Sequence, residues 1–271
     1  MIEIFKTILI GIVQGITEWL PISSTGHMIL LDQLISLDVS DDFRKMFFVV
    51  IQLGSILAVV VLYFKKLNPF STPPQEKKRV LSLWGKIIIG VIPAGVVGIL
   101  LDDWLDEHFY NYITVAVTLV LYGILFIIIE RRRKGKRPSF QTVYDIDYKT
   151  AVAIGCFQVL SLVPGTSRSG STILGGMLMG SSRTAASEFS FFLAVPVMLG
   201  ASLIKVLKFG FAFSSSQLLI LLVGCTVAFL VSMAAIRFLI SFVRKNSFEL
   251  FGWYRIALGC IVLGYYLFIV R

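Results

Sequence analysis

Long apolar runs dominate the chain, and short polar or basic segments separate them. Six of these runs carry no charge, or extend past a single Lys or Arg that can reach the membrane surface, and so can cross the hydrocarbon of a bilayer. They are residues 46–64, 87–101, 109–129, 189–204, 209–236 and 256–270. The pattern therefore predicts six transmembrane helices.

The remaining apolar stretches are too short to cross comfortably, and they occur as two pairs, each broken by a proline. They are approximately residues 2–20 with 22–36, and 150–163 with 166–181. We interpret each pair as a re-entrant helical hairpin that enters and leaves on one side of the membrane. A hairpin plus three spans is an odd number of crossings, so the second half is inverted relative to the first.

The predicted fold is therefore an all-α polytopic membrane protein with an inverted-topology repeat. The first repeat covers residues 1–130 and the second covers residues 150–271. Residues 131–149 form a basic linker between them.

Charge supports this topology independently. The connections at 65–82, 130–149 and 237–249 are rich in Lys and Arg, and the span count places all three on one face. The positive-inside rule makes that face cytoplasmic. Acidic residues, including those at 102–107, fall on the opposite face with both termini.

Composition agrees with a membrane protein, since 56% of the residues are hydrophobic, 15% are charged and the mean hydropathy is +0.85. The basic loops and anionic membrane lipids account for the net charge of +9, so no nucleic-acid partner is expected.

The first polar segment, residues 20–27, and the half-helix before it bring together groups that can do chemistry. Gln14 and Glu18 are four residues apart and share one helix face. An acid at this depth is costly unless it is paired or binds a cation, and intramembrane acids are usually functional. Ser24 and His27 are three residues apart and can meet on the first turn of the next helix, where His27 is a candidate catalyst. Ser23 and Thr25 can cap this helix or bind a substrate.

The second polar segment, residues 163–172, has the features of an anion site. Arg168 lies where a new half-helix starts, and its guanidinium can bind two phosphate oxygens at once, in a bidentate contact. Ser171 stands where a nucleotide-binding P-loop requires lysine, so the segment is not a P-loop. The candidate substrate contacts around Arg168 are Gly165, Thr166, Ser167, Ser169 and Thr172.

Together the two segments suit phosphoryl transfer, in which Glu18 and Gln14 hold a divalent cation and Arg168 binds the anion. A secondary transporter or flippase for an anionic lipid or solute is the alternative, because inverted repeats with broken helices are also the transporter pattern. The motif Asp102-Asp103-Trp104-Leu105-Asp106 would suit a prenyltransferase, although a solvated acidic loop explains it better. Arg255 either contacts the pocket or reaches the cytoplasmic interface.

These motifs resemble those of the bacitracin-resistance family of undecaprenyl-diphosphate phosphatases, over the whole chain. The residues that carry the resemblance are Gln14 to Glu18, Leu20 to His27 and Pro164 to Thr172. It implies hydrolysis of a polyprenyl diphosphate in the bacterial plasma membrane, at a site open to the outer side. The products would be undecaprenyl phosphate, which is recycled as the lipid carrier of peptidoglycan synthesis, and inorganic phosphate.

The resemblance also implies Mg²⁺ or Ca²⁺ as cofactor and catalytic roles for Glu18, Ser24, His27 and Arg168. Gln14 replaces a glutamate that many family members have, so one carboxylate fewer is left for the metal. Whether Ser24 or His27 is the nucleophile stays open at this point, as do the lipid chain length and the oligomeric state.

Overall fold

The structure, a computed structural model, describes residues 1–70 and 73–270, without the side chains of Asp102, Asp103, Asp106 and Val270. The side chains of the acidic motif at 102–106 therefore lie mostly outside this description. Its backbone is helical and continues the helix Pro74–Phe109, so the expectation of an acidic loop here is wrong. The prediction of six membrane spans is confirmed for the described ranges, which contain six apolar helical segments long enough to cross a bilayer. They are residues 41–62, 74–101, 112–133, 183–209, 215–245 and 249–269.

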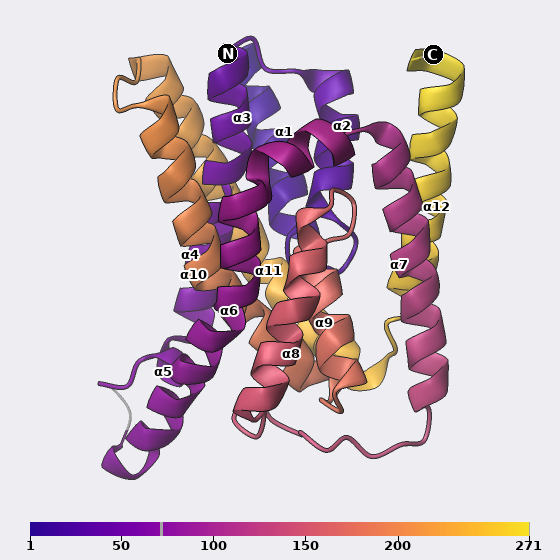
Figure 1. Ribbon diagram of the computed structural model, residues 1–271. Coiled ribbons are helices and arrows are strands. Elements are labelled where there is room, and N and C mark those ends of the chain that lie inside the picture. The colour runs from indigo at the N-terminus through magenta and orange to yellow at the C-terminus, as the bar shows by residue number, and fades with distance from the viewer. Residues whose placement is uncertain (71–72, 271) are drawn as a thin grey trace.

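These six spans are built from seven helices and form the frame of the molecule (Figure 1). They are α3 (Asp41–Val50), α4 (Gln52–Leu62), α6 (Pro74–Phe109), α7 (Tyr112–Arg133), α10 (Arg183–Phe209), α11 (Ser215–Lys245) and α12 (Glu249–Tyr265). The helices α3 and α4 together make one span, and the short α5 (Phe64–Leu67) follows them. A five-residue π-helical turn, Tyr266–Val270, extends α12.

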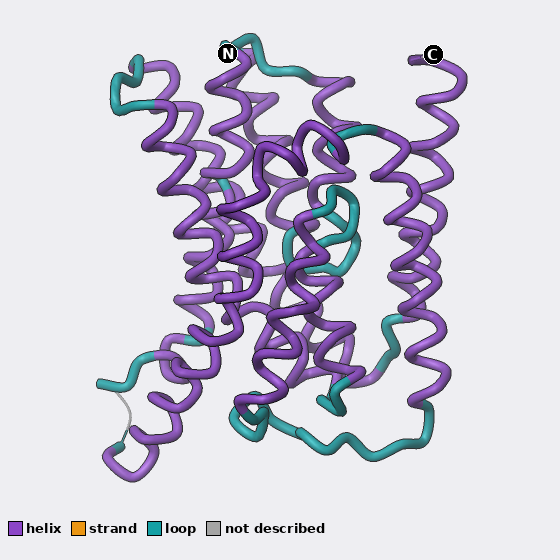
Figure 2. The backbone as a smooth tube through the Cα atoms, in the orientation of Figure 1, coloured by secondary structure: helices purple, strands orange, loops and turns teal. Residues whose placement is uncertain are grey.

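Two shorter helix pairs enter the frame from opposite ends. The first is α1 (Ile2–Thr17) with α2 (Ser24–Ile35), and the second is α8 (Tyr148–Val159) with α9 (Arg168–Leu178). A 3-10 turn, Leu160–Leu162, follows α8. Figure 2 shows the two connecting loops near the middle of the molecule, with both termini at one end and the loop after α7 at the other. This is the arrangement of two opposed hairpins.

Each hairpin packs against a span from the other half of the chain, through glycines that allow close approach. A Cβ atom on Gly11 of α1 would lie 3.0 Å from the Cβ of Val227 in α11. A Cβ atom on Gly155 of α8 would collide with the backbone of Gly90 in α6. The division into repeats at residues 130 and 150 stays a prediction, but α1 on α11 and α8 on α6 form matching crosswise contacts.

The three basic connections are shorter than the sequence predicted, because charged residues continue the helices. The predicted span 87–101 lies within the longer α6, and most of the predicted connection 237–249 lies within α11 and α12. Arg244 and Lys245 occupy the last turn of α11, where cations interact favourably with the negative end of the helix dipole. Long cationic side chains also let an apolar helix continue into the headgroup region.

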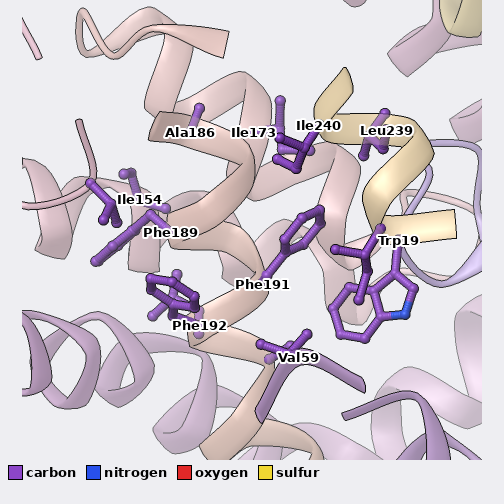
Figure 3. Close-up of a cluster of buried hydrophobic side chains, with 14 of the residues drawn as sticks. Trp19, Val59, Ile154, Ile173, Ala186, Phe189, Phe191, Phe192, Leu239 and Ile240 are labelled. Carbon is purple, nitrogen blue, oxygen red and sulfur yellow. The ribbon is translucent and has the colours of Figure 1, made fainter. Parts of the chain in front are cut away.

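A buried aromatic cluster holds the tip of the first hairpin, which is the loop between α1 and α2, in place beside α10. Trp19 has no exposed surface, and its ring meets that of Phe191 edge to face, with centroids 5.1 Å apart. Figure 3 shows both rings within the cluster, beside Val59. Because Trp19 directly follows Glu18, its packing fixes the depth and direction of the carboxylate.

Candidate active site

An ion pair joins the two hairpin tips. Arg168 Nη2 donates to Glu18 Oε1 over 3.0 Å. Only 4% of the Glu18 side chain and 11% of the Arg168 side chain are exposed. Since each charge is costly to bury alone, each depends on the other, and the contact between the tips brings them together.

The second oxygen of Glu18 accepts two hydrogen bonds from its own hairpin. Gln14 Nε2 donates to Oε2 over 3.0 Å from one turn earlier in α1. Ser24 Oγ donates to the same oxygen, also over 3.0 Å. Glu18 therefore holds the Ser24 hydroxyl in the geometry that a general base requires.

The second terminal nitrogen of the Arg168 guanidinium is held by α10. Its Nη1 donates to the carbonyl oxygen of Ser190 over 2.8 Å, and the Ser190 hydroxyl accepts a bond of 2.7 Å from Thr172 Oγ1. The guanidinium carbon lies 5.5 Å from the Trp19 ring centroid, within the range of cation–π attraction. Arg168 is thus oriented by three residues, Glu18, Trp19 and Ser190, in contacts that a flexible lysine could not reproduce.

The two tips use the same backbone device. Ser23 and Ser167 have φ angles of 73° and 72°, in the left-handed region that non-glycine residues seldom adopt. Each hydroxyl accepts the amide of the residue three positions later, Gly26 at 3.2 Å and Gly170 at 3.1 Å. Both serines, predicted as substrate contacts, thus serve here as helix caps.

His27 lies beside the tip but does not bond to Ser24. Its Nδ1 is 2.7 Å from the carbonyl oxygen of Ser23, and its Nε2 is 2.7 Å from the hydroxyl of Tyr254. A carbonyl oxygen can only accept, so Nδ1 carries the proton, and in the neutral ring Nε2 is the accepting nitrogen. The expected Ser24–His27 contact is absent from the hydrogen bonds of the described residues, because Ser24 turns to Glu18 instead.

Arg255 is fully buried and ties the two tips together, so it does not reach the cytoplasmic interface. Its Nη1 donates to the carbonyl of Pro21 over 3.1 Å, and its Nη2 donates to the carbonyls of Gly165 and Thr166 over 2.9 Å each. The sequence left its role undecided. The structure assigns it to the site as a cross-link between loops that are more than 140 residues apart in the chain.

The remaining candidates shape the loops or line them. Ser169 Oγ donates to the carbonyls of Glu18 and Leu20, at 3.2 and 3.4 Å. Gly165 has a φ of 87°, and a side chain there would collide with Thr118, whose hydroxyl donates to the carbonyl of Pro164 over 2.8 Å. Thr25 is half-buried in the first turn of α2.

The donor set at the tips suits a divalent cation only in company with a substrate. Among the described residues no group of three or more His, Cys, Asp or Glu side chains could hold a metal ion. Mg²⁺ often binds through one or two carboxylates together with substrate phosphates. Glu18 Oε1 accepts one hydrogen bond, from Arg168, which leaves a lone pair for a cation. Gln14 directs its amide nitrogen at Glu18, so it acts here as a donor, and its role as a ligand stays a prediction.

Sequence reasoning missed several residues whose role depends on tertiary contacts. Ser190, Trp19, Tyr254 and Thr118 carry no motif, and each acts through a partner far away in the chain. Only Trp19 had a signal that could have been used, because it directly follows the buried acid.

The sequence is similar to those of proteins in a known family. The family model of the bacitracin resistance protein BacA matches residues 7–261. An undecaprenyl-diphosphatase of Desulfitobacterium hafniense is 59% identical over 269 residues, covering 98% of this chain and 97% of that protein. An undecaprenyl-diphosphatase of Enterococcus faecalis is 56% identical over 271 residues, covering 98% of both chains.

A third relative, the undecaprenyl-diphosphatase of Acetivibrio thermocellus, is 58% identical over 269 residues, covering 98% of this chain and 99% of its own. The family match includes the tips of both hairpins and all of the site residues, from Gln14 to Arg255. The chain therefore belongs to the bacitracin resistance protein BacA family.

Proposed function

We propose that the chain is a membrane phosphatase that hydrolyses undecaprenyl diphosphate to undecaprenyl phosphate and inorganic phosphate. Relatives more than half identical over nearly their whole length carry the name undecaprenyl-diphosphatase. Within this chain, the observation that carries the proposal is the cluster of Glu18, Ser24 and Arg168, which brings together a carboxylate, a hydroxyl and a fixed guanidinium. The reaction returns the lipid carrier to cell-wall synthesis, and its acceleration gives resistance to bacitracin.

In the proposed mechanism Ser24 is the nucleophile and Glu18 its base. Ser24 Oγ attacks the terminal phosphorus while its proton moves to Glu18 Oε2, which it already contacts. The bond from that phosphorus to the bridging oxygen breaks, and undecaprenyl phosphate leaves with the electron pair. Arg168 exchanges its bond to Glu18 for phosphate oxygens and stabilises the charge that develops on them.

Hydrolysis of the phosphoserine completes the cycle. Water attacks the phosphorus and gives its proton to His27, whose Nε2 is the accepting nitrogen of the neutral ring. Glu18 returns its proton to the departing oxygen of Ser24, and inorganic phosphate leaves. The serine and the carboxylate are thereby restored, and His27 releases its proton to solvent.

We propose Mg²⁺ or Ca²⁺ as the cofactor, held by Glu18 together with phosphate oxygens of the substrate. When bound, the cation supplies positive charge that neutralises the diphosphate. The support is the chemistry of the site, where a buried carboxylate keeps one lone pair open beside the position that the anion would occupy.

We further propose that the site faces the outer side of the plasma membrane, with both termini. Ser24, Thr25 and His27 are the half-buried residues of the first tip, and α2 leads from them to the end of the molecule that holds the termini. In a chain without native cysteines, Gly135→Cys should react with an impermeant thiol reagent only from the cytoplasm, and Ala212→Cys only from outside. The reverse pattern would contradict the orientation.

Release of phosphate from undecaprenyl diphosphate by the purified protein in detergent tests the function. Ser24→Ala should lose nearly all turnover, whereas Ser216→Ala, at an exposed serine in the first turn of α11, should keep it. With substrate labelled in its terminal phosphate, quenching should trap an acid-stable phosphoserine. An acid-labile phosphoenzyme would make His27 the nucleophile, and no phosphate release by the wild type would refute the proposal.

A further inference from the structure

A polar cavity lies at the end of the molecule away from both termini. It has a volume of about 410 Å³ and is formed by the last turn of α7, the connection that follows it, the ends of α9 and α11, and the first turn of α10. In Figure 1 these segments gather at the lower edge, below the hairpin tips. Arg168 begins α9 at the tips, and Ser181 follows the opposite end of this helix, so the cavity is separate from the active site.

Positive charge in this cavity is largely uncompensated. One carboxylate, Glu130, lines it, and it is 3% exposed. Arg183 donates to both carboxylate oxygens of Glu130, over 2.8 and 2.6 Å, and Oε1 also accepts a hydrogen bond of 2.8 Å from the amide of Phe248. Four more cations line the same cavity without an ion pair to any carboxylate in the described part of the chain. They are Arg133, Lys134, Lys136 and Arg244.

Two buried groups in the wall have no hydrogen-bond partner. Ser181 is 1% exposed, and its hydroxyl is unpaired, as is the Nη1 atom of Arg133. Buried polar groups in proteins are almost always hydrogen-bonded, and leaving one unpaired is destabilising. A ligand with several acceptor oxygens would satisfy both the hydroxyl and the guanidinium.

The cavity also contains the start of α10, where backbone amides are unpaired. Ser182 caps the helix by accepting the amide of Ala185 over 3.0 Å. The amides of Arg183 and Thr184, both in the cavity wall, precede the first intrahelical bonds. This end of a helix carries partial positive charge and attracts anions.

The first turn of α3 has the opposite charge pattern to the first turn of α10. It begins in the same way, with Ser40 accepting the amide of Phe43 over 3.4 Å, but Asp41 and Asp42 follow and compensate the helix dipole. In α10 the first turn has no acid, and cations surround it. Cations gathered at the positive end of a helix repel the dipole unless an anion lies between them.

We propose that this cavity binds a phosphate group from the cytoplasmic side, carried by the head of an anionic lipid or present as free inorganic phosphate. Basic pockets between helices on the cytoplasmic side commonly bind anionic lipid headgroups. The proposal rests on the proposed orientation in the membrane. It does not rest on the hydrolytic reaction, because binding here is measured without turnover.

Native mass spectrometry of the full chain in detergent, with phosphatidylglycerol or phosphatidylcholine, tests the binding. The cavity variant is Arg133→Gln with Lys134→Gln. The control, Lys65→Gln with Lys78→Gln, removes the same charge from exposed residues outside the cavity. Loss of two charges should weaken phosphatidylglycerol binding about thirtyfold in the cavity variant. The control should lose less than about threefold, since exposed charges are screened.

Competition between inorganic phosphate and phosphatidylglycerol distinguishes a lipid head from free phosphate as the ligand. If the ligand is a lipid head, millimolar inorganic phosphate should leave the phosphatidylglycerol adduct intact. If it is free phosphate, inorganic phosphate should displace the lipid and raise the melting temperature of the wild type but not of the cavity variant. A second cavity variant, Lys136→Gln with Arg244→Gln, gives the same comparison if the first does not fold.

Equal losses in the cavity and control variants would overturn the proposal, because lipid binding would then depend on surface charge in general and not on the cavity. Equal binding of phosphatidylglycerol and phosphatidylcholine by the wild type, with no effect of inorganic phosphate on melting, would overturn it as well.

Discussion

Removing one member of the Glu18–Arg168 pair should destabilise the fold more than removing both. In Glu18→Gln the guanidinium of Arg168 keeps its charge in a site where 11% of its side chain is exposed. Breaking a buried pair costs about 3–5 kcal/mol, because the remaining charge is left without compensation. For a chain of this size, 1 kcal/mol shifts the melting temperature by about 2 °C, so each single variant should melt about 6–10 °C below the wild type.

The double variant, Glu18→Gln with Arg168→Gln, leaves no unpaired charge. Two amides of similar size can bond to one another and to Ser24, so the double variant should melt no lower than either single variant. The assay is thermal unfolding of purified protein in detergent, followed by tryptophan fluorescence or by retention on a sizing column. Neither measurement requires substrate or activity, so the test concerns the pair alone.

Glu188→Gln is the matched control. This carboxylate is also buried, with 7% of its side chain exposed, but its partner Lys66 is 41% exposed and can be solvated when the pair is broken. We expect a loss of about 1 kcal/mol or less, typical of pairs with access to water. If the losses of Glu18→Gln and Arg168→Gln simply add in the double variant, the two residues do not depend on each other, and the reasoning is wrong.

Three further variants test how the tips are held. Arg255→Lys keeps the charge, but one ammonium cannot reach the carbonyls on both tips, so kcat should fall at least tenfold while the protein still folds, as measured by phosphate release and by melting. Gly165→Ala should abolish turnover and lower the melting temperature, since the new methyl group meets Thr118 in a left-handed conformation; Gly95→Ala, at an open position, is the control. Tyr254→Phe removes the hydroxyl beside His27 Nε2 and should change the pH profile of kcat with little effect on stability; an unchanged profile would exclude His27 from proton transfer.

The parts of the site that follow from sequence are those carried by local rules. Proline followed by a hydroxyl cluster predicts a helix break and a new cap, and Ser23 and Ser167 provide those caps. The spacing of Gln14 and Glu18 predicts a shared face, and the two side chains are hydrogen-bonded. The six spans follow from hydropathy alone.

The contacts that Arg255 makes with both tips could not be predicted, because their acceptors are backbone carbonyls. Arg255 binds oxygens of Pro21, Gly165 and Thr166, and nothing about those side chains marks them as partners of an arginine. The Ser24–His27 pair was expected from spacing along one helix. The competing acceptor, Glu18, lies on the other side of a sharp turn whose direction depends on the unusual backbone of Ser23.

The pairing of Glu18 with a residue 150 positions later has a consequence for how the chain is made. At ribosomal speeds of about 5–20 residues per second, Arg168 is synthesised roughly 8–30 s after Glu18. The helix α11, on which α1 packs, is synthesised later still. During this interval the first hairpin carries a carboxylate without its cationic partner beside lipid. Because burying this carboxylate alone is costly, we expect the first hairpin to reach its final position only after the second hairpin has been made.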